Sequence, residues 1–335
     1  MVCFRSNSLL MLLGALLFLI TCGTHGQSAP RLANTPGWQQ TPYERNPLLF
    51  ASEQEAVQAL GSPDILMRRS GVQWLGQWTG TIYGAAPNQA HDTVLRSQTS
   101  LVPHLIRAVR EMPDADSQQA ARLMAVMGET AQLGIPAICA EIVSSDYGDG
   151  TPEGVKDLSA CADLTTSLAL LCGGPDGVSA HLTPLLQSSS PDTRRVVAGT
   201  LGFRNSLLAN RRLWDLNSYS LPPEVWRRRN LAFDRQAIPA LALGLDDPVL
   251  AVRLAAAHSL ETLTYGSSQA PWQEALPPLT RALSSPDPVL RRTAARTLAL
   301  VPTDTSPVAA ALRDALHGRD KAVVSYMITA LSHAA

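Results

Sequence analysis

One pattern recurs five times along the chain, and it constrains the fold more than any other feature. Each copy opens with an aspartate, and the copies lie at 64–75, 192–201, 247–260, 287–298 and 320–331. In four copies an arginine is followed by small or apolar residues at +3, +4 and +7, as Arg253 is by Ala256, Ala257 and Leu260. This is the spacing of one face of an α-helix. The recurrence predicts a chain built from repeated helices.

The aspartate marks where each of these helices is expected to begin. Aspartate accepts hydrogen bonds from the free N–H groups of a first helical turn. Pro248 and Pro288 directly follow two of the aspartates, and proline has no N–H to leave unpaired at the first helical position. An apolar-periodic segment precedes several copies, for example over 238–245. Each repeated unit is therefore predicted to be a pair of helices.

Two helices per unit, with the second opening on aspartate and carrying an early arginine, resemble the HEAT repeat. They are also similar to the HEAT-like repeats of phycobilin-lyase-type proteins. The resemblance runs from about residue 46 to the C-terminus, with weaker units around 114–127 and 153–171. It implies an all-α, HEAT/armadillo-type α-solenoid of about six to seven helix pairs, which bury their apolar faces by stacking. The arginine is expected to be structural, either solvated or in a salt bridge within its own repeat.

The first 26 residues have the layout of a secretory signal. Arg5 precedes an apolar run over 9–20, and small and polar residues follow. The run is shorter than the roughly 20 residues of a membrane-spanning helix, although an uncleaved anchor is an alternative. The residues Leu19-Ile20-Thr21-Cys22 resemble a bacterial lipobox, which implies lipidation at Cys22; an ordinary cleavage site is the other interpretation. The mature protein is expected to be exported, either periplasmic or attached to the membrane only through this lipid anchor.

Residues 27–45 are polar and punctuated by proline, which predicts a flexible tether before a solenoid over 46–335. An insertion over 203–234 interrupts the repeats. It combines arginines with aromatic residues, and such surfaces bind anionic or planar partners. The candidate partner-binding residues are Arg211, Arg212, Trp214, Tyr219, Trp226, Arg227, Arg228 and Arg229. The alternative is a helical insertion whose tryptophans dock on the solenoid and whose arginines are solvated.

Glu111 to Asp163 is strongly acidic, with ten acidic residues against Arg122 and Lys156, a net charge of 2 − 10 = −8. An acidic patch here, opposite a basic insertion, would steer partners or allow self-association.

Two loops, 81–87 and 264–271, resemble each other, and Trp74, Trp78 and Trp272 lie near them in the sequence. They are expected to form either a recognition edge or a recurring turn whose tyrosine fills a gap.

Three cysteines remain after the signal. Cys139 can form a disulfide with Cys161 or Cys172 in an oxidising compartment, or all three are small buried hydrophobic residues.

Sequence motifs for catalysis are absent. The chain has no His-Glu-x-x-His, no Gly-x-Ser-x-Gly and no glycine-rich phosphate loop, so we expect no catalytic residue, no cofactor and no metal site. A net charge of −1 gives no reason to expect nucleic-acid binding. We predict a non-catalytic scaffold or adaptor of the cell envelope that binds protein partners. The alternatives are a HEAT-like lyase or hydrolase, and a binder of anionic glycan or lipid headgroups, an anionic envelope component, through the insertion.

Overall fold

The computed structural model describes residues 50–79, 89–112, 114–144, 158–202, 223–265, 271–318 and 320–332. All of them belong to one compact unit, Asn46–Ala335. Within these ranges the regular elements are helices, and none of the described residues forms a strand. The predicted all-α class is confirmed.

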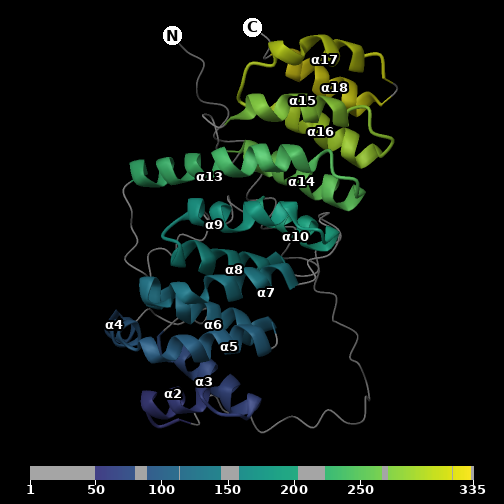
Figure 1. The fold of residues 1–335 in the computed structure, drawn as a ribbon. Coiled ribbons are helices and arrows are strands. Elements are labelled where there is room, and N and C mark those ends of the chain that lie inside the picture. Colours follow the sequence, from purple (N-terminus) through teal and green to yellow (C-terminus); the bar gives the residue numbers. More distant parts are fainter. Residues whose placement is uncertain are drawn as a thin grey trace, which may run out of the picture. The chain divides into compact units, whose positions relative to one another are not determined.

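The described residues form seven consecutive helix pairs, each with a first and a second helix (Figure 1). The pairs are α2 (Glu53–Leu60) with α3 (Ile65–Trp78), α5 (Val102–Glu111) with α6 (Asp114–Met127), α7 (Ile135–Ser144) with α8 (Leu158–Leu171), α9 (Pro175–Leu182) with α10 (Pro191–Leu201), α13 (Pro223–Gly244) with α14 (Leu250–Thr264), α15 (Trp272–Ala282) with α16 (Pro288–Leu300), and α17 (Ala309–Ala315) with α18 (Lys321–Leu331). A further helix, α4 (Gln89–Ser97), packs on α6. The predicted α-solenoid is confirmed.

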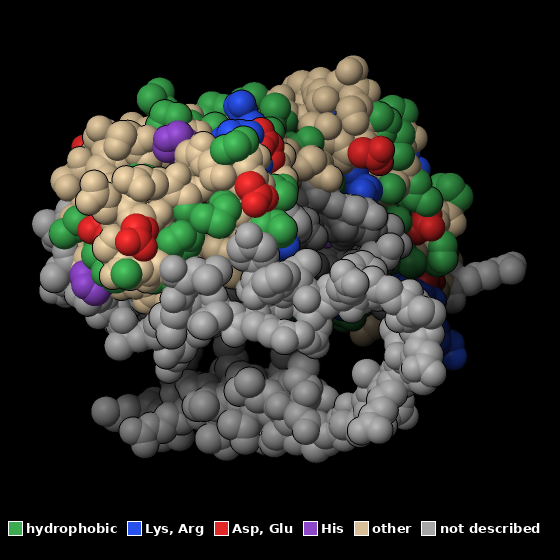
Figure 2. All heavy atoms as spheres, turned by 90° about the horizontal axis from the view of Figure 1, so that it is seen from below, with side chains coloured by type: hydrophobic (Ala, Val, Ile, Leu, Met, Phe, Trp, Pro, Cys, Tyr) green, Lys and Arg blue, Asp and Glu red, His purple; other side chains and the backbone are tan. Residues whose placement is uncertain are grey.

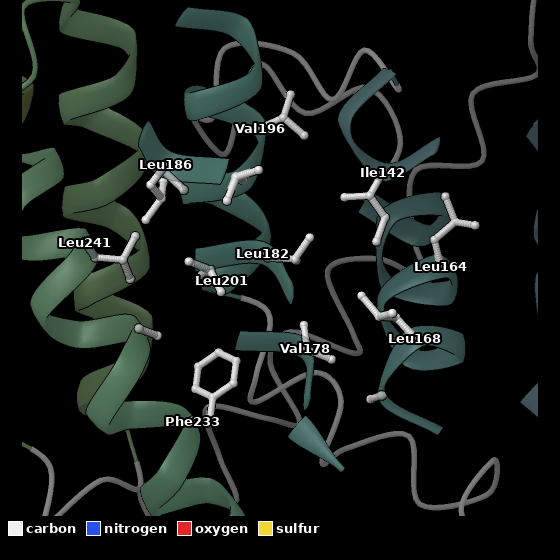
Figure 3. Close-up of a cluster of buried hydrophobic side chains, with 14 of the residues drawn as sticks. Ile142, Leu164, Leu168, Val178, Leu182, Leu186, Val196, Leu201, Phe233 and Leu241 are labelled. Carbon is white, nitrogen blue, oxygen red and sulfur yellow. The ribbon is translucent and has the colours of Figure 1, made fainter. Parts of the chain in front are cut away.

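The second helices form a continuous layer. Contacts run in order from α3 through α6, α8, α10, α14 and α16 to α18, while α13 contacts α9 and α15 in the layer of first helices. The buried hydrophobic side chains of all pairs join in one cluster. Figure 3 shows its middle, where Phe233 of α13 lies close to side chains of the α9–α10 pair. No pair could bury its apolar face alone, so stability is shared between neighbours.

Three of the five aspartates begin their helices as predicted. Asp64, Asp287 and Asp320 are the N-caps of α3, α16 and α18, and each carboxylate accepts a hydrogen bond from a backbone N–H of the first turn. Pro288 occupies the first position of α16. These caps supply partners for N–H groups that have none within the helix.

The predicted helix start is wrong in the other two copies. Ser190 is the N-cap of α10, because its hydroxyl accepts a hydrogen bond from the N–H of Thr193, and Asp192 lies inside the first turn. Helix α14 begins three residues after Asp247, so Pro248 precedes the helix. Asp247 accepts one hydrogen bond from a backbone N–H, but both of its oxygens also face Arg194 of the preceding pair.

A recurring proline shapes the first helices, and the repeat pattern above did not include it. The prolines are Pro103, Pro136, Pro184, Pro239, Pro278 and Pro307. Proline lacks an N–H and clashes with the preceding turn. Accordingly, 3₁₀ segments lie at or just before four of these prolines: η2 (Thr99–Leu101), η3 (Gly128–Gly134), η4 (Thr183–Gln187) and η5 (Ser306–Val308). In α13 the proline is internal, so the residues before it extend the first helix of that repeat.

One long apolar run occurs among the described residues. Ala115–Ser144, which covers α6, η3 and α7, is long and apolar enough to cross a membrane by length and composition alone. However, 67% of its most apolar window is buried inside the protein. Gly128, with φ of 65°, lies at the turn where α6 gives way to η3. This run supplies core helices of the solenoid.

The two ends of the described helix array differ. Helix α2 exposes Gln54, Glu55 and Gln58, and Figure 2, which views this end, shows hydrophobic side chains scattered among polar and acidic ones. A polar outer face is what a terminal repeat needs. At the other end α18 exposes Ile328. The corresponding residue of α16, Ala295, is fully buried.

Candidate interaction surface

The repeated arginine of the second helices closes the turn inside its own pair. Nη1 of Arg68 donates hydrogen bonds to the carbonyl oxygens of Ser62 and Pro63, at 2.9 and 2.8 Å. The same two bonds, to the carbonyls six and five residues earlier, are made by Arg194, Arg253 and Arg291. These carbonyls follow the end of the first helix and lack helical partners. The geometry agrees with the structural role predicted for this arginine, in a form that spacing alone did not reveal.

Ion pairs then join successive helix pairs. They are Arg68–Glu111, Arg69–Asp116, Arg122–Asp163, Asp176–Arg229, Arg194–Asp247, Asp246–Arg281, Glu261–Arg296 and Arg292–Asp320. Asp116 and Asp163 are buried. These two members of the predicted acidic patch are therefore internal partners of arginine and do not belong to a charged surface.

Most of the predicted partner-binding residues lie outside the described part of the chain. This holds for Arg211, Arg212, Trp214 and Tyr219, for the side chains of Trp226 and Arg227, and for the candidate lipidation site Cys22. Only Arg228 and Arg229 of this set have described side chains, and Arg228 is exposed to solvent.

Arg229 makes a structural contact with the preceding pair. Its Nη1 lies 3.3 Å from Oδ1 of Asp176. Its side chain covers a glycine turn, since a Cβ added at Gly174 would lie 2.6 Å from Cδ of Arg229. Gly173 beside it has φ of 72°, a conformation that favours glycine. With Phe233 buried on the same helix, this described end of the insertion packs on the solenoid. Trp214 and the side chain of Trp226, on which the alternative interpretation depends, lie outside the described residues.

Two arginines of α16 lie on the surface of the second-helix layer. The side chain of Arg292 is 59% exposed and that of Arg296 is 43% exposed. Nε of Arg292 is 2.9 Å from Oδ2 of Asp320, and this hydrogen bond is the largest cause of the lowered pKa of Asp320. Nη2 of Arg296 is 2.5 Å from Oε2 of Glu261. Partial burial lowers the pKa of Arg296, but the hydrogen bond to the Glu261 carboxylate helps to outweigh it, so the pKa is raised overall.

Residues of α14 flank these arginines. Nδ1 of His258 lies 3.9 Å from Oε2 of Glu261. Tyr265, directly after α14, is 54% exposed. The gap-filling role predicted for the loop tyrosine is therefore wrong at Tyr265, whereas Trp272 of the same loop region is fully buried. The other loop, 81–87, lies outside the described residues.

A doubled arginine in the sequence is the signal that could have identified this surface. The doublets are Arg68-Arg69, Arg194-Arg195 and Arg291-Arg292, and consecutive helix residues point in different directions. The first of each doublet closes the turn, and the second is free to reach the surface or the next helix pair. The +3, +4 and +7 spacing includes only the first arginine of each doublet.

The cysteines behave as small hydrophobic residues in the described part of the chain. Cys139 and Cys172 are free thiols that pack against the core. Burial raises the pKa of Cys139 to about 11 and that of Cys172 to about 12. The reactive thiolate is therefore scarce at neutral pH. The side chain of Cys161 lies outside the described residues.

The described residues also contain no group of three or more His, Cys, Asp or Glu side chains that could hold a metal ion.

Residues 238–332 match the family model for HEAT repeats. This segment of the chain is identified as HEAT repeats. The match covers α14 to α18 and the repeat-like half of α13, where helix pairs follow one another without insertion. The surface formed by Arg292, Arg296, His258 and Tyr265 lies entirely within this HEAT segment. No curated protein matches the chain.

Several solved structures of engineered or designed proteins are similar to this chain. An engineered protein has a TM-score of 0.38 and 21% identity, covering 70% of this chain and 96% of its own. A designed armadillo repeat protein has a TM-score of 0.38 and 15% identity, covering 85% and 100%. A second one, solved in complex with the peptide (KR)4, has a TM-score of 0.37 and 16% identity, covering 85% and 100%.

Proposed function

We propose that this protein is a non-catalytic interaction scaffold of the cell envelope that binds protein partners. One observation carries the proposal: consecutive HEAT pairs present exposed arginine and tyrosine side chains on the layer of second helices. Arginine and tyrosine are enriched in protein–protein interfaces and at their energetic centres. Stacked helical repeats, moreover, use extended surfaces to bind partners.

The envelope setting rests on the secretory layout of residues 1–26. If Cys22 carries several acyl chains, the protein will be held firmly on a membrane, because several chains bind where one binds only marginally. Cell fractionation tests this: we expect the wild type with the membranes and Cys22→Ser in the soluble exported fraction. Finding both proteins in the cytoplasm would contradict the envelope setting and leave the scaffold proposal intact.

Crosslinking in cells, followed by mass spectrometry on the tagged full chain, tests the binding function. We expect reproducible crosslinks to one or a few partner proteins, at stoichiometric levels. Cells that express the tag on an unrelated exported protein serve as the control. Recovery of the isolated chain alone, under several gentle crosslinking conditions, would refute the scaffold proposal.

A further inference from the structure

We infer that the second-helix face of α14, α16 and α18 docks an acidic peptide segment of a partner protein. This inference rests on the proposed scaffold function and locates its binding surface. The surface consists of Arg292, Arg296 and Leu300 of α16, with Tyr265 after α14, and we refer to it as the α16 surface. Its residues lie in the part of the chain that matches the HEAT model.

The three α16 residues form one stripe. Arg292, Arg296 and Leu300 are spaced four residues apart, so they lie above one another on a single helix face. All three side chains reach solvent. Because α16 lies between α14 and α18 in the layer, a segment crossing this stripe would touch three successive pairs.

Charge is distributed unevenly between the inside and the outside of this surface. The carboxylates lie behind the arginines: the side chain of Glu261 is 11% exposed and that of Asp320 is 18% exposed. The corresponding positions of α14 carry Leu254, His258 and Thr262 and therefore add no carboxylate. A partner approaching from solvent meets guanidinium groups first, which complements a negatively charged segment.

Both arginines retain unused hydrogen-bond donors. Arg292 bonds Asp320 only through Nε, and Arg296 bonds Glu261 only through Nη2. Among the described residues, the two Nη groups of Arg292 have no hydrogen-bond partner. The same is true of Nη1 of Arg296. The two Nη groups of a guanidinium match the two oxygens of a carboxylate in a planar pair. Arg292 can therefore take a second carboxylate through both Nη groups, and Arg296 can donate to one through Nη1, while the existing pairs with Asp320 and Glu261 remain.

Apolar groups stand beside these donors. Tyr265 is exposed directly after α14, which packs on α16, and Leu300 lies one turn beyond Arg296. An interface needs such side chains next to its charged contacts, because they exclude water from the pair. The matching segment thus carries Asp or Glu residues with spaced apolar side chains.

Fluorescence anisotropy with a short, labelled, glutamate-rich peptide containing spaced leucines tests the inference on the full chain. We expect Arg292→Gln with Arg296→Gln to weaken binding roughly tenfold or more, since two charge-assisted contacts are lost. Arg281→Gln is the matched control, because Arg281 is also 59% exposed and paired with an acid but lies on a first helix. The control should bind as the wild type does.

Two further measurements separate a binding effect from a folding effect. Arg292→Gln alone leaves the Arg296–Glu261 pair intact and should still weaken binding, and Arg296→Lys, which keeps the positive charge, should retain most of it. Thermal unfolding of every variant must show a folded protein. Equal weakening by Arg281→Gln, or equal binding of a peptide with lysine in place of glutamate, would overturn the inference.

The outcomes also distinguish this inference from the scaffold proposal. No binding of the glutamate peptide, together with in-cell crosslinks that map elsewhere on the chain, would overturn the α16 surface and leave the scaffold standing. Absence of any crosslinked partner would overturn the scaffold itself. Binding to phosphatidylglycerol vesicles but not to the peptide would assign the arginines to a lipid surface and also refute the inference.

Discussion

The helix pairs before and after α13 use the same arginine differently. In the earlier pairs, Arg68 and Arg194 close their own turn and also reach an acid of the next pair, Glu111 and Asp247. In the later pairs, Arg253 and Arg291 donate hydrogen bonds to the carbonyl oxygens of their own turns. Arg68 and Arg194 thus stabilise the turn within their own pair and also the contact with the next pair.

The later junctions rely on other arginines, which are more exposed. Arg281, Arg292 and Arg296 pair with acids of neighbouring units from the surface, whereas Arg68 is almost fully buried. Both Nη groups of the buried Arg68 donate hydrogen bonds within the fold. Surface arginines have donors left over, so the same residue type stabilises the array in one half and is available to partners in the other.

The largest test of this difference removes the arginine in each half. Arg68→Met should lower the free energy of unfolding by about 3 kcal/mol, because buried carbonyls lose a charged donor and the inter-pair bond is lost. Arg291→Met, at the same position in α16, should cost about 1 kcal/mol, because its bonds are closer to solvent. Urea denaturation measures both. Equal losses of unfolding free energy would show that Arg68 and Arg291 stabilise the fold to the same extent.

A glycine in α3 tests how closely the helices approach. At Gly71, a Cβ would lie 2.8 Å from the carbonyl oxygen of Ala56 in α2, while the later repeats have Ala256 and Ala294 at this position. Gly71→Ala should therefore destabilise the protein by about 2 kcal/mol through overpacking. Ala294→Gly, the reverse change, should cost about 1 kcal/mol through helix propensity. A neutral Gly71→Ala would mean that α2 shifts readily on α3.

Sequence periodicity predicted the solenoid because the repeated apolar face must be buried whichever residues lie outside it. It predicted the caps at Asp64 and Asp287 because capping depends on a few neighbouring residues. The predicted helix start failed at Asp247, because this residue pairs with Arg194, which is far away in the sequence. The α16 surface was missed for the same reason, because Glu261, the partner of Arg296, lies one repeat earlier in the sequence. The aromatic insertion that appeared most functional lies outside the described residues, apart from its docked end.

Acid should weaken the junction held by Arg194 and Asp247. Burial raises the pKa of Asp247, but the Arg194 hydrogen bond and other favourable contacts outweigh it, so the pKa falls below the ordinary value of 3.8. A lowered pKa stabilises the fold above that ordinary value and ceases to do so as pH falls through the lowered one. Asp247→Asn should thus be less stable than the wild type at pH 7, and the difference should shrink below about pH 4.

Urea midpoints measured from neutral to acidic pH provide the check. Asp246→Asn is the control, because Asp246 is half-exposed in its pair with Arg281, and exposed pairs contribute little. A stability gap for Asp247→Asn that stays constant down to the most acidic pH would contradict the assignment of the acid effect to this junction.

The smallest predicted effect concerns Gly199 of α10, which precedes α13. It occupies the helix position that His258 and Arg296 hold in the later repeats, and a Cβ there would meet no atom within 4 Å. Gly199→Ala should stabilise the protein by about 0.5–1 kcal/mol, because alanine has less freedom to lose on folding and no steric cost. Gly202→Ala is the contrast, since its Cβ would lie 2.6 Å from Oγ of Ser259. A destabilising Gly199→Ala would mean that the native fold needs the open space at this position. The second-helix face before α13 would then differ from the α16 surface in packing as well as in charge.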